Sequence, residues 1–64
     1  MTNLQRIRKE RGLSQADLSN ASSVSLRTIQ DYEQGQKPIN KAAAITVHRI
    51  ATVLGVKIED LLED

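Results

Sequence analysis

Apolar residues recur along this chain at the three- and four-residue steps of amphipathic helices, and the alternation typical of strands is absent. Glycine and proline are few and stand between the apolar segments, where they favour turns and helix ends. They fall at Gly12, Gly35, Pro38 and Gly55. The pattern therefore predicts an all-α chain of short helices.

The first two helices are predicted from a narrow apolar stripe and a cap. Within Thr2–Arg11, Leu4 and Ile7 stand three apart among polar residues, which indicates a short amphipathic helix. Ser14 is followed three residues later by Asp17, the pattern of an N-cap hydroxyl with an acid in the first turn. A second short helix should begin there.

A third helix is predicted after a segment rich in turn-forming residues, Asn20–Ser25. Ser25 offers an N-cap, and the helix should run to Gln34, where Gly35 ends it. Gln36–Asn40, which contains a proline, should form a loop.

A longer fourth helix, capped by Asn40 and ended by Gly55, is predicted from apolar residues at helical spacing. Its apolar face comprises Ala43, Val47, Ile50 and Leu54, extended by Ala44 and Ala51. The last apolar residues, Ile58, Leu61 and Leu62, predict a final short helix that folds back onto the core. The expectation is a compact five-helix domain.

Length and composition limit the classes of function. At 64 residues the chain should form one domain over residues 1–64, one that is whole rather than cut from a longer regulator. It has no cysteine for disulfides or thiol chemistry, and it is too small for a catalytic cleft of ordinary size. His48, the only histidine, lacks companions for a metal site. We expect that the protein is not an enzyme, binds no cofactor or metal, does not contact a membrane and acts in the cytoplasm.

The net charge of +1 conceals an uneven distribution. All nine Lys and Arg residues lie between Arg6 and Lys57 with only four acids, so residues 1–57 carry +5 and residues 58–64 carry −4. A basic body suits binding to phosphate, although an ordinary solvated surface explains the same charges.

Residues 15–34 combine two short helices, a turn of about four residues and a capped second helix, the arrangement that presents a recognition helix to the DNA major groove. Apolar or small residues stand where the two helices should pack. These are Leu18, Ser19, Val24, Ile29 and Tyr32, and for the tyrosine we expect core packing rather than base stacking.

The chain resembles the Cro/phage-repressor (XRE-like) helix-turn-helix family through nineteen positions in order. They are Gly12-Leu13-Ser14-Gln15, Leu18, Val24-Ser25, Ile29, Glu33, Gly35, Pro38, Ile50-Ala51, Leu54-Gly55-Val56, Glu59 and Leu61-Leu62. The resemblance implies a five-helix DNA-binding fold, often dimeric on a two-fold symmetric operator.

The resemblance also assigns roles. Residues expected to meet base edges are Ser25, Leu26, Arg27, Gln30 and Asp31. Arg27 suits guanine, Gln30 suits adenine, and the acid could accept from cytosine. Residues expected to bind phosphate are Gln15, Thr28, Lys37, Lys41 and the amide of Gln34, with Gln15 also bracing the recognition helix. Arg8 and Glu33 would form a partly buried structural ion pair.

Three positions depart from the family pattern. Ser23 occupies a turn position that usually carries a left-handed glycine, so either the turn differs slightly or the domain tolerates strain of about 1–2 kcal/mol. About four extra residues follow Pro38, and we interpret them as an added turn at the start of the fourth helix. Asp31 would face a polyanion, and it stands four residues after Arg27, where it could instead pair within the helix. Leu26 could likewise be an ordinary exposed leucine.

The sequence thus predicts an operator-binding transcription regulator, a repressor, that binds double-stranded DNA as a homodimer. The last helix, around Ile58, Leu61 and Leu62, and the exposed side of the fourth helix are the expected dimer surfaces. The alternative is a protein-interaction or antitoxin-like module on the same fold, which Asp31 and the acidic tail favour.

Overall fold

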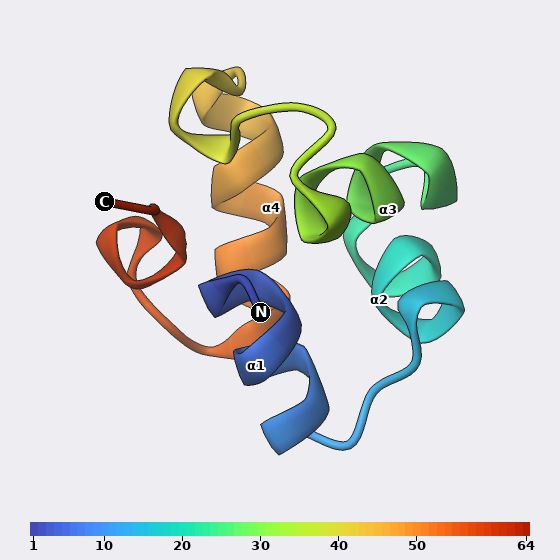
Figure 1. Ribbon diagram of the computed structural model, residues 1–64. Coiled ribbons are helices and arrows are strands. Elements are labelled where there is room, and N and C mark those ends of the chain that lie inside the picture. The colour runs from blue at the N-terminus through green and yellow to red at the C-terminus, as the bar shows by residue number, and fades with distance from the viewer.

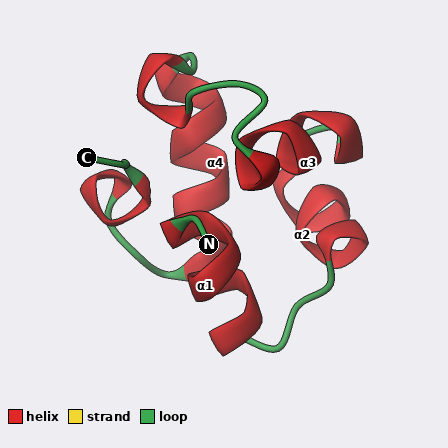
Figure 2. Cartoon of the chain, in the orientation of Figure 1, coloured by secondary structure: helices red, strands yellow, loops and turns green.

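The computed structural model describes residues 1–64 as helices and turns without strands (Figures 1 and 2). The α-helices are α1 (Asn3–Glu10), α2 (Gln15–Ser22), α3 (Leu26–Gln34) and α4 (Ala44–Leu54), and the 3-10 turns are η1 (Ile39–Lys41) and η2 (Ile58–Leu61). The all-α class is confirmed. The count of five helices is wrong, because the last apolar segment forms one 3-10 turn rather than an α-helix.

Side-chain caps start the first three helices where the sequence places hydroxyls. Ser14 and Asp17 form the full capping box of α2: the Asp17 amide donates to Ser14 Oγ at 2.9 Å, and the Ser14 amide donates to Asp17 Oδ2 at 3.0 Å. Ser25 caps α3 by accepting from the Thr28 amide at 3.1 Å. Thr2 caps α1 in the same manner. The predicted starts of α2 and α3 are confirmed.

The start of α4 differs from the prediction. Residues 39–41 form the separate turn η1, the chain is extended at Ala42, and α4 begins only after Ala43, which provides no side-chain cap. Asn40 pairs instead with the backbone of Glu63, whose amide donates to Asn40 Oδ1 at 2.8 Å and whose carbonyl accepts from Asn40 Nδ2. The additional residues after Pro38 therefore build a turn rather than lengthen the helix.

The core gathers apolar residues from all six elements and the interhelical turn around α4. Its buried members are Leu4, Ile7, Leu18, Val24, Ile29, Ile39, Val47, Ile50, Ala51, Leu54 and Leu61. Leu61 is completely buried, and the buried Ile39 packs η1 against the core. Ala43 and Ala44, expected on the apolar face of α4, are exposed because the helix starts later than predicted.

Figure 1 shows α2 and α3 together on one side of α4 and the C-terminal turn on the other, with α1 crossing near the N-terminus label. The two chain ends are joined: the Asn3 amide donates to Glu63 Oε2 at 2.7 Å, and Asn3 Nδ2 donates to the Leu62 carbonyl at 2.8 Å. None of the helices has the length and apolar character that crossing a membrane would require.

Candidate nucleic-acid interface

The turn between α2 and α3 contains one strained residue. Ser23 lies in the left-handed region, at φ 59° and ψ 28°, so of the two alternatives the turn keeps its left-handed position and the domain tolerates the strain. Two other serines hold the turn: Ser19 Oγ donates to the Val24 carbonyl at 2.6 Å, and Ser22 Oγ donates to the Leu18 carbonyl at 2.6 Å. The Ser19 hydrogen bond connects α2 to the residue just before the cap of α3, whereas the Ser22 hydrogen bond lies within α2.

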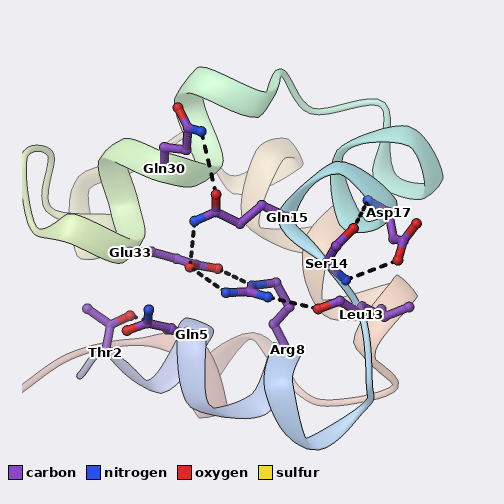
Figure 3. A network of polar contacts seen from close by, with 9 residues as sticks. All are labelled: Thr2, Gln5, Arg8, Leu13, Ser14, Gln15, Asp17, Gln30 and Glu33. Carbon is purple, nitrogen blue, oxygen red and sulfur yellow. Dashed lines mark hydrogen bonds and ion pairs between the residues drawn. The ribbon is translucent and has the colours of Figure 1, made fainter.

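A buried ion pair joins α1 to the end of α3 (Figure 3). Arg8 Nε donates to Glu33 Oε2 at 2.6 Å and Nη2 donates to Oε1 at 3.0 Å, a bidentate arrangement. Arg8 Nη1 also donates to the Leu13 carbonyl at 2.8 Å. The hydrogen bond that Arg8 donates to Glu33 raises the pKa of Arg8 against the opposing effect of burial. The structural pair that the resemblance implies is therefore present.

Gln15 connects this ion pair to the outer face of α3. Its Nε2 donates to Glu33 Oε1 at 2.9 Å, and its Oε1 accepts from Gln30 Nε2 at 3.5 Å, the longer and weaker of the two contacts (Figure 3). Gln15 thus braces α3 as expected. Its contact with a phosphate stays a prediction, as does the contact of the half-buried Gln30 with a base.

The first turn of α3 presents an exposed surface. Leu26 is 40% exposed, and the Arg27 side chain is 83% exposed. Ser25 is also exposed, but its hydroxyl caps the helix and shares a 2.8 Å hydrogen bond with Thr28 Oγ1. Of the expected base-contacting residues, Arg27 is therefore the one whose polar end reaches furthest into solvent.

Asp31 is buried between two exposed cations. Its Oδ1 accepts from Arg27 Nε at 3.1 Å, and its Oδ2 lies 3.7 Å from Lys37 Nζ. The Asp31 side chain is only 9% exposed, against 64% for Lys37. The intrahelical pair that the four-residue spacing predicts is present. The sequence did not reveal the burial, because it depends on how the chain returns after Gly35.

The remaining candidate phosphate contacts are dispersed. Gln34 is exposed at the end of α3, and Lys37 follows on the loop beside Asp31. Lys41 lies on η1, which Figure 1 shows beside the start of α4 and apart from α2. The structure brings Lys37 to α3 and leaves Lys41 on a separate element.

Two polar contacts with structural roles were not found from the sequence. Arg11 Nε donates to the Leu54 carbonyl at 2.9 Å and thereby satisfies the end of α4. Asn40 ties η1 to the C-terminal segment. Both join residues far apart in the chain, and no local pattern marks them.

A shallow hollow of about 320 Å³ lies between the end of α2 and α4. It is lined by Ala21, Ser22, Ser23, His48, Arg49, Thr52 and Val53. His48 is exposed at this hollow, and no group of three or more His, Cys, Asp or Glu residues is placed to hold a metal.

Residues 4–61 match the model of a protein family described as helix-turn-helix. The match includes α2, α3 and α4 completely. Comparisons with curated proteins and with solved structures gave no match.

Proposed function

Because the chain belongs to the Cro/C1-type (XRE-like) helix-turn-helix family of DNA-binding transcription regulators, we propose that it is a sequence-specific repressor reading the major groove with α3. Its place of action would be the cytoplasm of a bacterium or phage-infected cell, where the operator lies. Its effect on transcription would come from occupying that operator.

The observation that carries this proposal is that Arg27 is exposed on α3, a helix that is fixed in place by contacts with α1 and α2. α3 is fixed to α1 by the Arg8–Glu33 pair and to α2 by Gln15. A rigid support matters because bidentate recognition of guanine O6 and N7 requires a defined position of the guanidinium. Arg27 is therefore the proposed principal base-reading residue, with Gln30, Leu26 and Ser25 beside it.

Phosphate contacts would flank this reading surface. Gln15 and Thr28 would contact the DNA backbone from the starts of α2 and α3, and Gln34, Lys37 and Lys41 from the far side. Such contacts position the domain without carrying sequence information, and they make affinity fall as salt rises.

We further propose a homodimer on a two-fold symmetric operator. Leu61 is completely buried in the core and is not available for a dimer surface. Ile58 and Leu62 are half-buried, and Ile45 on α4 is 56% exposed. These three residues are apolar candidates for contact with a second copy.

The test is selection from a random duplex library followed by fluorescence anisotropy and a salt titration. The expected result is a selected sequence whose binding weakens steeply with salt and whose selectivity is lost in Arg27→Ala. Arg6→Ala is the matched control, because Arg6 also pairs with an acid four residues later on an exposed helix face. It should bind the selected duplex nearly as the wild type does.

Failure to enrich any duplex at low salt would overturn the proposal. The outcome would then favour the alternative, a protein-interaction or antitoxin-like module, for which the acidic residues of the C-terminal segment would be the first surface to examine.

A further inference from the structure

We propose that Asp31 is a positioning residue for DNA specificity: it holds the Arg27 guanidinium by Nε and leaves both Nη groups free to bind a guanine. This inference rests on the proposed DNA-binding function. In this proposal Asp31 does not contact a cytosine itself. It affects specificity indirectly, through Arg27.

The hydrogen-bond geometry supports this role. The contact of Arg27 with Asp31 runs through Nε, at 3.1 Å, and it is the only protein hydrogen bond of the Arg27 side chain. The two Nη groups at the tip therefore keep their donors. A guanidinium held by its Nε edge retains the parallel N–H pair that matches O6 and N7 of guanine.

Burial separates the acid from the bases. The Asp31 side chain is 9% exposed beneath Arg27 and Lys37, whose side chains are 83% and 64% exposed. A residue covered in this way is poorly placed to meet a base edge directly. It is well placed to fix the direction of the longer side chain above it.

The same carboxylate sets the charge of the reading surface. Arg27, Lys37 and Asp31 together carry a formal charge of +1 instead of +2. Attraction to phosphate grows with each cation regardless of sequence, so the acid lowers binding to non-specific DNA. Asp31 should thus widen the difference between specific and non-specific affinity in two ways, through geometry and through charge.

Asp31→Asn is the central test, because the amide keeps the shape and removes the charge. Binding is measured to the selected duplex, to the same duplex with the Arg27-dependent G·C pair replaced, and to random duplex. We expect discrimination at that base pair to fall about fivefold or more. Affinity for random duplex should rise, with a salt slope steeper by up to about one.

Arg27→Ala and the double variant Arg27→Ala/Asp31→Asn show whether the effect passes through Arg27. In the absence of Arg27, the change at Asp31 should leave discrimination at that base pair unchanged. If Asp31→Asn does not fold, as judged by circular dichroism, Asp31→Glu replaces it. The glutamate keeps the charge and displaces the carboxylate, so discrimination should fall without a gain in random-duplex affinity.

The outcomes separate this inference from the proposed function. A folded Asp31 variant that keeps full discrimination, while Arg27→Ala loses it, overturns the positioning role and leaves the DNA-binding proposal intact. A wild-type protein that selects no duplex overturns both.

Discussion

The carboxylate of Glu33 accepts two hydrogen bonds from the guanidinium of Arg8, at 2.6 and 3.0 Å, and so connects the first helix to the last turn of α3. The Glu33 side chain is only 1% exposed. Arg8→Ala would leave this carboxylate buried with Gln15 as its remaining side-chain partner. We expect a loss of about 3–5 kcal/mol in the free energy of unfolding, measured by urea titration.

The control is again Arg6→Ala, which removes an exposed pair and should cost less than about 1 kcal/mol. The double change Arg8→Met/Glu33→Leu should recover most of the lost stability, because no buried charge is left without a partner. Similar unfolding free energies for Arg8→Ala and Arg6→Ala would contradict this account of the ion pair.

The capping box of α2 makes part of the stability depend on pH. The amide and hydroxyl of Ser14 hold the pKa of the Asp17 carboxyl below its ordinary value of 3.8. A carboxyl with a lowered folded-state pKa stabilises the fold above its unfolded pKa, and this contribution is lost as the pH falls through the lower folded value. The thermal stability of Asp17→Asn should therefore differ from that of the wild type near neutral pH, and the difference should disappear in acid.

The measurement is thermal unfolding of both proteins from about pH 7 down to about pH 2. Glu59→Gln is the control, because Glu59 is an exposed acid without a side-chain hydrogen bond in the structure. The difference in thermal stability between Glu59→Gln and the wild type should not disappear in acid. A difference between Asp17→Asn and the wild type that persists at the acid end would refute the link to the capping box.

The left-handed Ser23 predicts a stabilising substitution. Ser23→Gly removes the Cβ strain of about 1–2 kcal/mol, and part of this gain is offset by the greater freedom of glycine in the unfolded chain. We expect a net gain of about 0.5–1 kcal/mol by urea unfolding. Ser23→Ala is the matched control, because it keeps the Cβ and the Ser23 side chain makes no hydrogen bond in the structure. Equal stability of the two variants would show that the turn is not strained.

The closure of the chain ends through Asn40 gives a further prediction. Asn40→Ala removes both hydrogen bonds to the backbone of Glu63 and should lower the free energy of unfolding by about 1 kcal/mol. The amide hydrogen of Glu63 should also exchange faster with solvent. Asn20→Ala is the control, since Asn20 is exposed and makes no side-chain hydrogen bond. Unchanged exchange at Glu63 would argue against the closure.

The parts of this fold that the sequence predicted depend on neighbouring residues. Caps at Ser14 and Ser25 and helix ends at Gly35 and Gly55 involve atoms within four or five residues, so the local pattern is sufficient. Asn40 does not cap α4, although asparagine has the chemistry of an N-cap. Its actual partner lies 23 residues away, and only the assembled core brings that partner within reach.

The same distinction applies to the candidate site. The spacing of Arg27 and Asp31 predicted their pairing, because residues four apart share a helix face. The approach of Lys37 to Asp31 depends on the left-handed Gly35, which turns the chain back along α3. Consequently the sequence showed an acid beside an arginine but not an acid buried between two cations.

The two lysines assigned to phosphate differ in how the structure supports them, and salt dependence can measure each one. Lys37 is held beside α3 by Asp31, whereas Lys41 lies on η1 with no ion pair of its own. If each lysine neutralises one phosphate, Lys37→Ala and Lys41→Ala should each reduce the magnitude of the slope of log affinity against log salt by about one. Lys57 is an exposed lysine near the C-terminal end of the domain, and Lys57→Ala should leave the slope unchanged. If the slope falls for Lys37→Ala but not for Lys41→Ala, the inserted turn η1 holds Lys41 too far from the DNA backbone to contact it. Equal decreases in all three variants would mean that the slope reports only the net charge of the domain.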